Sequence, residues 1–368
     1  MLLELADLLR GQVSIFHLFQ YVTFRTIMSA LTALVVALLL GPDVIRRLTA
    51  VKAGQVIRSD GPQTHLAKAG TPTMGGALIL LAVAIATLLW ADLHNRYMWI
   101  ALGTMLAFGV IGFYDDYKKL VLRDSRGLAA RWKYFWQSVC GFAAALGLYF
   151  VMHENSPAAM ALYVPLFKQV AIPLGVVFIA VAYFIIVGFS NAVNLTDGLD
   201  GLAIMPTVLV ASALGVFAYA AGNSIFSTYL QIPAVPGAGE LCIFCGSLAG
   251  AGLGFLWFNA YPAQVFMGDT GSLALGGIIA SLAIIVRKEL LIPIFCFVFL
   301  VENLSVVIQV SYFKYTKRKY GEGKRIFLMS PLHHHYQKLG YHESKIAVRF
   351  WVVTILSVVF AVVTLKLR

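Results

Sequence analysis

Hydrophobic residues in this chain form long, nearly uninterrupted stretches separated by short polar segments. Each stretch is about 20 residues long, which is the length a helix needs to cross ~30 Å of hydrocarbon. Backbone groups in lipid must hydrogen-bond to one another, so we expect each stretch to be a helix. The alternation typical of barrel strands is absent. The pattern predicts ten membrane spans, at approximately 19–41, 75–92, 97–114, 134–152, 172–190, 201–221, 240–257, 271–286, 290–312 and 346–366.

Composition supports the same fold class. The chain is 60% hydrophobic and 12% charged, with a mean hydropathy of +0.82, whereas a soluble globule carries about 25% charged residues. We therefore predict an all-α, polytopic integral membrane protein, with residues 1–368 forming one domain. Residues 1–18 are expected to form a short amphipathic helix on the membrane, and no signal peptide is expected.

Lysine and arginine predict the orientation. The loops at 42–74, 115–133 and 313–345 hold 19 of the 28 basic residues, and all three follow odd-numbered spans. Basic loops mark the cytoplasmic side, so both termini are expected in the periplasm. Topogenesis explains most of this bias. Attraction of the basic face for anionic lipids and a phosphate-rich substrate is an equally good interpretation, and both can hold at once.

Small residues inside the spans favour packing over chemistry. The four cysteines all lie in apolar spans, so the pair Cys242 and Cys245 is expected to be buried rather than to bind zinc. Gly246, Gly250 and Gly254 recur every four residues in the seventh span, a spacing that predicts close approach of another helix.

Acidic residues and histidines gather at one membrane edge. In chain order they are Asp43 and Asp60 after the first span, Asp115 and Asp116 after the third, Asp197 and Asp200 after the fifth, Asp269 after the seventh, and His333, His334 and His335 after the ninth. Loops that follow odd spans lie on one side of a bilayer, so these groups share one face. Carboxylates at a lipid edge are unfavourable unless they bind a metal or perform chemistry.

Two of these motifs carry acids in close succession. Asp115 and Asp116 are adjacent, so one of their pKa values should rise unless a cation lies nearby, which makes the pair a candidate metal site or general base. A solvated helix end is the alternative. Asp197 and Asp200 share a face if their segment is helical, and Gly198 permits close approach of a ligand, so a functional role is favoured over simple capping.

Three further motifs allow two interpretations each. Asp269 either caps the eighth span or binds Mg²⁺, and Phe266 either stacks on a base or packs. Three consecutive histidines cannot all point one way on a helix, so hydrogen bonds to phosphate or sugar are favoured over a shared metal or a solvated surface. In the segment 68–76, Lys68 and the free amides suit an anion, although an ordinary helix entry explains the segment as well.

The motifs together suggest phosphoryl transfer at the membrane surface, because carboxylates suit Mg²⁺ and lysines offset phosphate charge. The absence of a Walker A loop or kinase signature argues against ATP hydrolysis. Four segments, in this order, resemble the polyprenyl-phosphate N-acetylhexosamine-1-phosphate transferase family: F-Y-D-D-Y-K-K, N-A-V-N-L-T-D-G-L-D-G-L, N-A-Y-P-A-Q-V-F-M-G-D-T-G-S and P-L-H-H-H-Y. The triple histidine and G-T-P-T-M-G-G resemble the peptidoglycan branch of that family, and the likeness covers essentially the whole chain.

The resemblance implies transfer of phospho-MurNAc-pentapeptide from UDP-MurNAc-pentapeptide to undecaprenyl phosphate, on the cytoplasmic face of the bacterial inner membrane. Lipid I and UMP are the products, and Mg²⁺ is required. It also implies membrane lipid as a partner, a homodimer and no nucleic acid. We favour direct attack by the lipid phosphate over a covalent aspartyl intermediate.

The resemblance also assigns roles to residues. Asp269 matches the magnesium ligand, Asp115 and Asp116 match the acidic pair with Asp115 as candidate base, and Asp197 lies beside the metal. His333, His334 and His335 match the loop that contacts the sugar-peptide side. The positions expected to bind the substrate's nucleoside or phosphates are Lys68, Thr73, Lys119, Asn191, Asn194, Gly198, Leu199, Asp200, Asn259 and Phe266, with Phe266 under the uracil.

Two alternatives stay open at the level of sequence. A sister enzyme that moves GlcNAc-1-phosphate to a polyprenyl phosphate would share the aspartates and differ around the histidines. An ion-coupled transporter would place its acids along a pathway at the bilayer midplane rather than at one edge.

Overall fold

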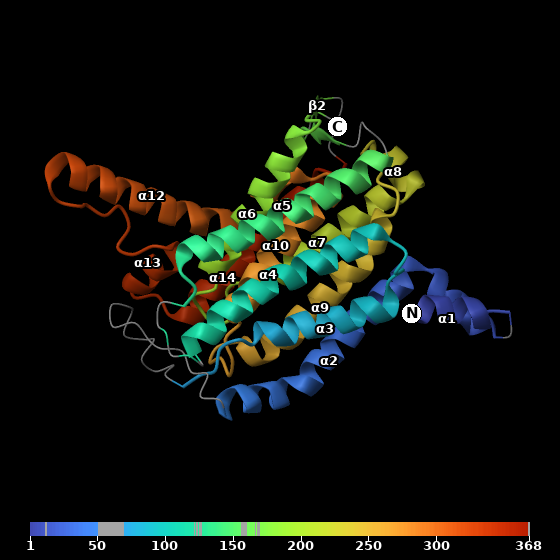
Figure 1. Cartoon of the computed structure of the whole chain (residues 1–368), viewed down its shortest axis with the longest axis horizontal. Helices are drawn as coiled ribbons and strands as arrows, with labels where there is room; N and C mark the ends of the chain where they lie inside the picture. Colours follow the sequence, from blue (N-terminus) through green and yellow to red (C-terminus); the bar gives the residue numbers. More distant parts are fainter. Residues whose placement is uncertain are drawn as a thin grey trace.

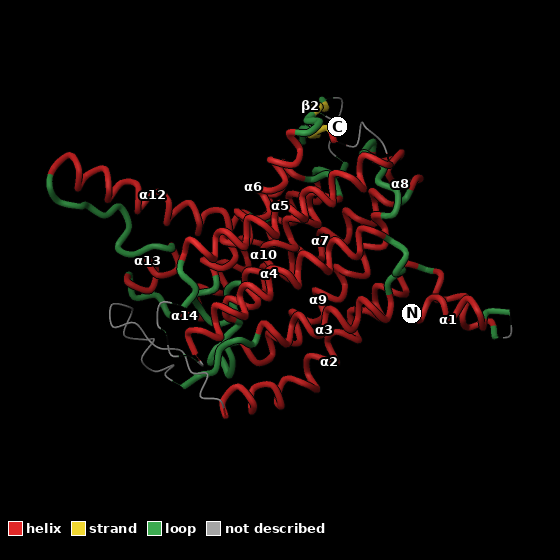
Figure 2. The backbone as a smooth tube through the Cα atoms, viewed as in Figure 1, coloured by secondary structure: helices red, strands yellow, loops and turns green. Residues whose placement is uncertain are grey.

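A computed structural model describes residues 1–11, 13–50, 70–120, 122, 124, 127–155, 160–165, 167 and 170–366. The described residues form helices, connecting loops and one small antiparallel ribbon of two strands, β1 (Ala161–Tyr163) and β2 (Ala171–Pro173) (Figure 2). The helices are α1 (Leu2–Leu9), η1 (Ser14–Gln20), α2 (Val22–Ala50), α3 (Gly76–Trp90), α4 (Arg96–Leu120), α5 (Ala130–Asn155), α6 (Val177–Thr196), α7 (Ile204–Gly222), α8 (Ser224–Leu230), η4 (Ala238–Glu240), α9 (Leu241–Asn259), α10 (Gly268–Ile285), η5 (Glu289–Leu291), α11 (Ile292–Phe295), α12 (Phe297–Tyr320), α13 (Leu332–Lys338) and α14 (Glu343–Val363).

The prediction of a polytopic helical membrane protein is confirmed. Nine of the described helices are long and apolar enough to cross a membrane. The predicted second span coincides with α3, which has 15 residues and is therefore only about 22 Å long. That length is shorter than ~30 Å of hydrocarbon, so a tenth crossing stays a prediction.

Several helices extend beyond the apolar stretches that predicted them. The first span was expected to end at 41, yet α2 continues through Pro42 to Ala50. The third was expected to end at 114, yet α4 runs to Leu120 and carries Asp115 on the helix rather than in a loop. Hydropathy marks the part of a helix that faces lipid, whereas the helical hydrogen bonds continue wherever the backbone keeps its geometry.

Two other predicted spans differ from the helices of the structure, because a strand or a helix break lies within the apolar stretch. The fifth span was expected to begin at 172, but β2 occupies that position and α6 begins at Val177. The ninth span was expected to be continuous, but its helix is interrupted at Cys296, between α11 and α12. Only part of the predicted amphipathic N-terminal helix forms, as α1, and it is followed by the 3₁₀ helix η1.

The helices lie side by side in a bundle that has both chain termini at one end and α13 at the other (Figure 1). At its centre is α10, with 89% of its span buried inside the protein. It packs against α4, α6 and α3. The first turn of α10 is therefore held by the ends of several other helices, and this is where the polar residues converge.

The glycine repeat of α9 provides the predicted helix contact. A Cβ atom added at Gly250 would lie 2.0 Å from the carbonyl oxygen of Ala30 on α2, and one at Gly254 would lie 2.6 Å from the Cβ of Ala37. The packing interpretation of the repeat is thus confirmed. At the other end of this interface, buried Arg25 makes a two-point ion pair with Glu240, with N–O distances of 2.6 and 2.7 Å.

Candidate active site

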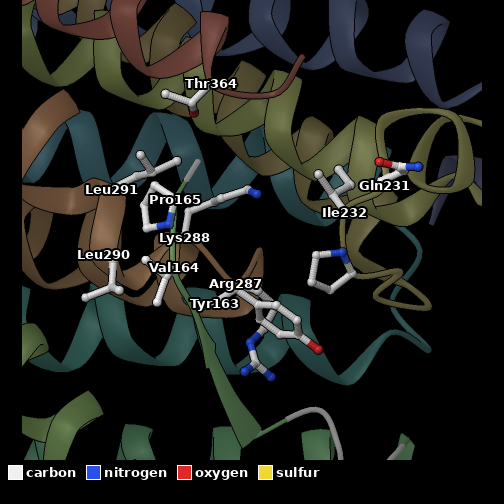
Figure 3. Close-up of a pocket in the computed structure, with 11 residues that line it drawn as sticks. Tyr163, Val164, Pro165, Gln231, Ile232, Arg287, Lys288, Leu290, Leu291 and Thr364 are labelled. Atoms are coloured by element: carbon white, nitrogen blue, oxygen red, sulfur yellow. The ribbon is translucent and has the colours of Figure 1, made fainter. Parts of the chain in front are cut away.

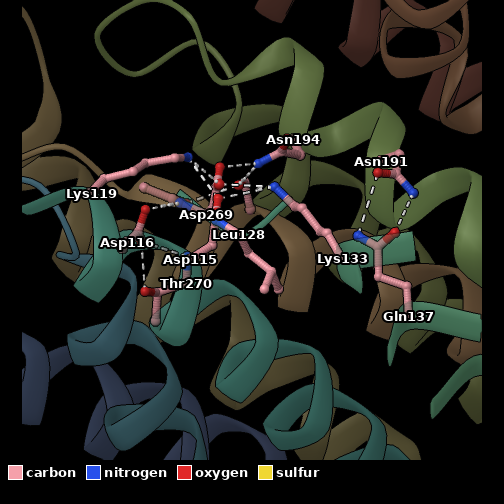
Figure 4. Close-up of polar contacts among 12 residues, drawn as sticks. Asp115, Asp116, Lys119, Leu128, Lys133, Gln137, Asn191, Asn194, Asp269 and Thr270 are labelled. Carbon is pink, nitrogen blue, oxygen red and sulfur yellow. Dashed lines mark hydrogen bonds and ion pairs between the residues drawn. The ribbon is translucent and has the colours of Figure 1, made fainter. Parts of the chain in front are cut away.

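Polar residues from four helices meet around the first turn of α10. Asp115, Asp116 and Lys119 come from the last turns of α4, Lys133 from the first turn of α5, Asn194 from the end of α6, and Asp269 from the start of α10. Figure 4 shows Lys119 and Lys133 approaching the aspartates from opposite sides. Hydrogen bonds join Asp116 to Thr270, which lies 154 positions later in the sequence. The sequence predicted only that these residues share one face of the membrane, and the structure brings them into contact.

Asp116 caps the N-terminus of α10. Its Oδ1 accepts a hydrogen bond from the backbone N–H of Asp269 at 3.2 Å, and its Oδ2 accepts from the N–H of Thr270 at 2.9 Å and from the Thr270 hydroxyl at 2.7 Å. The first amides of a helix lack partners within the helix, and a carboxylate there also interacts favourably with the helix dipole. Asp116 therefore fixes the position of Asp269.

Asp115 and Asp269 share two lysines. The Nζ of Lys119 lies 2.6 Å from Asp115 Oδ2 and 2.8 Å from Asp269 Oδ2. The Nζ of Lys133 lies 3.3 Å from Asp115 Oδ2 and 2.9 Å from Asp269 Oδ2. The other oxygen of Asp115 accepts the backbone N–H of Leu128 at 2.6 Å. Two carboxylates and two ammonium groups thus face one point at the end of the bundle.

Asparagines of α6 complete the polar cluster. Asn194 donates from Nδ2 to Asp269 Oδ1 at 2.6 Å and to the Ser272 hydroxyl at 2.8 Å. One turn earlier, Asn191 exchanges hydrogen bonds with Gln137 rather than with the aspartates (Figure 4). The Asn194 amide therefore orients the Asp269 carboxylate, whereas Asn191 joins α6 to α5.

Asp197 lies directly after α6 and is half-buried. Desolvation by burial, together with the charges of Asp269, Asp116 and Asp200, raises the pKa of Asp197 to about 8, although a hydrogen bond from the Gly268 backbone opposes the rise. A cation bound nearby would favour its ionised form.

The turn that follows Asp197 is fixed by hydrogen bonds to its backbone. The N–H of Asp200 donates to Glu343 at 2.8 Å, and the N–H of Gly201 donates to Asn259 Oδ1 at 3.1 Å. Asp200 Oδ2 in turn accepts the N–H of Ala263 at 3.0 Å. Leu199 is buried in a small apolar cluster with residues of α14. These contacts place the turn against the 259–265 segment.

The 70–76 segment runs beside the residues that precede α10. The N–H of Phe266 donates to the Pro72 carbonyl at 2.8 Å, and the N–H of Gly75 donates to the Phe266 carbonyl at 2.8 Å. Thr73 is buried, and a Cβ added at Gly268 would lie 2.8 Å from its hydroxyl oxygen. Thr73 therefore lies beside the capped end of α10, and Phe266 is half-buried next to it. Lys68 lies outside the described residues.

The three histidines of α13 face different ways, as expected for consecutive residues on a helix. His333 points inward and is fully buried, with its Nδ1 3.1 Å from Glu302 on α12. His334 and His335 are only partly buried, and their Nδ1 atoms lie 2.8 Å from Gln337 Oε1 and 3.2 Å from the backbone nitrogen of Leu328.

The cluster suits a hard divalent cation. Within the described residues, no three His, Cys, Asp or Glu side chains are grouped as a metal site. Mg²⁺, however, needs only one or two carboxylates when substrate phosphates supply further oxygens. Asp115 and Asp269 already turn one oxygen each toward the same positive charges, those of Lys119 and Lys133. This chemistry fits the predicted ion.

A separate pocket near the C-terminal end of α10 does not fit a nucleotide sugar. It lies around Tyr163, Gln231, Arg287 and Thr364 and has a volume of about 40 Å³ (Figure 3). That volume is far below the roughly 300–1,000 Å³ of typical small-molecule sites. The 18 residues of α10 separate it from Asp269 by about 27 Å.

Sequence reasoning missed several residues of the site. Lys133 had been counted only as a loop cation, although it contacts two of the predicted aspartates. Thr270 and Ser272 stood in a recognised motif but were given no role. Glu302 and Glu343 lie in apolar or unassigned stretches, and a glutamate within an apolar span was the one signal that could have identified Glu302.

Two family models match this chain. Residues 98–287, more than half of the chain, match glycosyl transferase family 4. Residues 68–80 match phospho-N-acetylmuramoyl-pentapeptide-transferase signature 1. The first match includes all of the clustered aspartates, and the second begins at Lys68 and includes Thr73.

Proposed function

Because the chain belongs to glycosyl transferase family 4 and carries the phospho-N-acetylmuramoyl-pentapeptide-transferase signature, we propose that the carboxylate–lysine cluster at the start of α10 is its catalytic centre. The chain is a multi-pass protein of the bacterial inner membrane that transfers phospho-MurNAc-pentapeptide to undecaprenyl phosphate in peptidoglycan synthesis. The shared lysine contacts of Asp115 and Asp269 are the observation that supports this location.

The reaction exchanges one phosphoanhydride bond for another. A phosphate oxygen of undecaprenyl phosphate attacks the phosphorus attached to the MurNAc sugar. The bond between that phosphorus and the oxygen of the leaving UMP breaks, and lipid I forms. Direct attack is sufficient, because the lipid phosphate is already a nucleophile once it is deprotonated, and no covalent aspartyl intermediate is needed.

Charge stabilisation is the main task of the site, as in phosphoryl transfer generally. Asp269 would hold Mg²⁺, which when bound offsets the charge on the diphosphate and on the departing UMP. Lys119 and Lys133 contact both Asp115 and Asp269. Their Nζ atoms donate to phosphate oxygens in the reaction, and their positive charge remains between the reacting groups.

Asp115 is the group that accepts the proton of the lipid phosphate. Its Oδ1 is held by the Leu128 backbone, so its Oδ2 stays directed at the cluster. Asp116 has both oxygens engaged by the start of α10, so it positions Asp269 and does not contact substrate. Asp197 would lie beside the bound metal, where its ionised carboxylate would contribute to the site.

The nucleotide sugar binds along the turn after α6. Gly198, Leu199, Asp200 and Asn259 shape the nucleoside side, and Phe266 lies under the uracil. The backbone hydrogen bonds of Asp200 and Gly201 keep this turn fixed relative to the cluster. We expect Lys68 and Thr73 of the signature segment to bind the phosphates, and His334 and His335 to contact the sugar-peptide side.

Charge and the arrangement of the chain ends support the proposed orientation. Both termini lie at one end of the bundle, opposite α13 (Figure 1). The predicted loops with 19 of the 28 basic residues follow odd spans, so the catalytic end faces the cytoplasm and both termini face the periplasm. We also expect residues 1–368 to act as one domain and the protein to be a homodimer.

Release of UMP tests the proposed function. We expect purified protein in detergent to release UMP from UDP-MurNAc-pentapeptide only when both undecaprenyl phosphate and Mg²⁺ are present. Chelation with EDTA should reduce the rate to background, and added Mg²⁺ should restore it. Turnover of UDP-GlcNAc in place of UDP-MurNAc-pentapeptide, or a rate that EDTA leaves unchanged, would contradict the proposal.

The lysine pair offers a second test. Lys133→Met should lower the transfer rate about 10- to 100-fold, because a charge-assisted hydrogen bond contributes roughly 1.5–3 kcal/mol. Lys118→Met is the matched control, since Lys118 faces Asp124 at 4.0 Å rather than the cluster. Initial rates of UMP release under saturating Mg²⁺ measure both. Equal rates for the two variants would remove Lys133 from the site.

A further inference from the structure

A buried carboxylate–histidine pair joins α12 to α13 outside the carboxylate–lysine cluster. Glu302 and His333 are both fully buried. The Oε2 of Glu302 lies 3.1 Å from Nδ1 of His333, and its Oε1 accepts the backbone N–H of His333 at 3.1 Å. Both oxygens of one carboxylate therefore hold a single residue, which fixes the place of its ring as well as of its backbone.

Burial of an ionisable side chain in a membrane-spanning helix costs free energy, so such residues are most often functional. Glu302 lies in α12, one of the helices apolar enough to cross the membrane. Nδ1 is the ring nitrogen that faces Glu302, and a carboxylate there accepts a hydrogen bond from Nδ1–H. Glu302 thus sets which ring nitrogen is available on the far side, as carboxylates do for histidines at catalytic and metal sites.

The available nitrogen faces the turn that follows α6. A Cβ added at Gly198 would lie 2.2 Å from Nε2 of His333, so only glycine leaves room for the ring. Nε2 is buried and makes no hydrogen bond within the part of the chain that the structure describes. Gly198 directly follows Asp197, whose carboxyl interacts with Asp269 and Asp116. The ring therefore packs against the turn that carries a residue of the proposed catalytic centre.

We infer that Glu302 is a positioning residue that acts through His333: it fixes the ring so that Nε2 is presented to the Asp197–Gly198 turn and to the diphosphate sugar bound there. The inference rests on the proposed function. It gives His333 a different task from His334 and His335, whose Nδ1 atoms bond to neighbours within or beside α13. A hydroxyl of the bound sugar that donates to Nε2 would provide its missing partner.

Three variants separate positioning from simple packing. His333→Asn keeps a donor near the place of Nδ1 for Glu302 but lacks Nε2, and Glu302→Gln keeps the shape but removes the charge that fixes the ring. We expect each to lower kcat about 10- to 100-fold, with KM for UDP-MurNAc-pentapeptide within about threefold. The double variant should be no slower than the slower single variant, because coupled residues are not additive.

His333→Gln provides a rescue, since its side-chain amide oxygen reaches farther along the ring direction, can accept a hydrogen bond in place of Nε2, and should recover part of the kcat lost in His333→Asn. Glu322→Gln is the control, because Glu322 is exposed beyond the end of α12 and should keep wild-type kcat. Wild-type kcat in His333→Asn would show that the ring only fills space, and additive losses in the double variant would show that Glu302 acts independently of His333. Either result overturns the inference.

Failure of the inference can be told apart from failure of the proposed function. If the wild-type protein releases no UMP from UDP-MurNAc-pentapeptide, the proposed function fails for every variant alike. The pair is then tested through the melting temperatures of the same variants in detergent. A double variant that melts no lower than the less stable single variant supports the coupling of Glu302 to His333, whereas additive losses contradict it.

Discussion

Asp269→Ala is expected to reduce transfer of phospho-MurNAc-pentapeptide at least about 1,000-fold, which corresponds to about 4 kcal/mol of lost transition-state stabilisation. The Asp269 carboxylate is the one that accepts from Asn194 and from both lysines of the cluster. Its removal takes away the proposed ligand of Mg²⁺ and leaves two ammonium groups without their shared partner. UMP release over a range of Mg²⁺ concentrations measures the loss.

A second substitution protects this test from a folding artefact. Asp269→Asn keeps the size of the side chain and an oxygen for Asn194 but loses the charge, and it should be equally inactive. Asp43→Asn is the control, because Asp43 is 58% exposed and pairs with nearby Arg46 at 2.9 Å, outside the carboxylate–lysine cluster. All three proteins should elute as a single species in detergent. If Asp269→Asn keeps substantial Mg²⁺-dependent activity, the metal assignment is wrong.

Gly112→Ala is expected to lower both activity and stability, even though Gly112 has no side chain to take part in chemistry. A Cβ at this position would lie 2.1 Å from the carbonyl oxygen of Asp269 and 2.6 Å from the nitrogen of Thr270. Backbone atoms cannot rotate away, so α4 and α10 must separate. Overpacking of this kind costs about 1–3 kcal/mol, and a displacement near 1 Å at a catalytic group lowers rates about 100-fold.

Gly103→Ala is the matched control for that prediction. Gly103 lies on the same helix, and nothing lies within 4 Å of a Cβ placed there. Alanine in place of glycine within a helix stabilises it by up to about 1 kcal/mol, so this variant should keep its activity and melt no lower than the wild type. Melting temperature and UMP release of the two variants, compared side by side, distinguish the close approach of α4 to α10 from a general effect of alanine. Normal activity in Gly112→Ala would contradict the geometry of the site.

The sequence identified the main acids of the site but not which contacts each of them makes. Asp115, Asp116 and Asp269 stood out because carboxylates beside apolar spans are unusual. Their partners did not, because Lys133 comes from another helix and looked like one of many basic residues at the membrane edge. A pairwise contact between helices depends on how each helix is rotated about its axis. The hydropathy of either helix does not predict that rotation.

The helical class of the protein depends on the chain alone, since apolar length decides which segments can enter lipid as helices. The order of the apolar segments also predicts that the acids share one face. Packing decided the rest. Only the close approach of α4 to α10 directs Asp116 to the helix end while Asp115 faces the lysines. Only the contact of α12 with α13 turns His333 inward toward Gly198. Neighbouring residues on a helix point about 100° apart, so their roles separate when the helix is fixed against its neighbours.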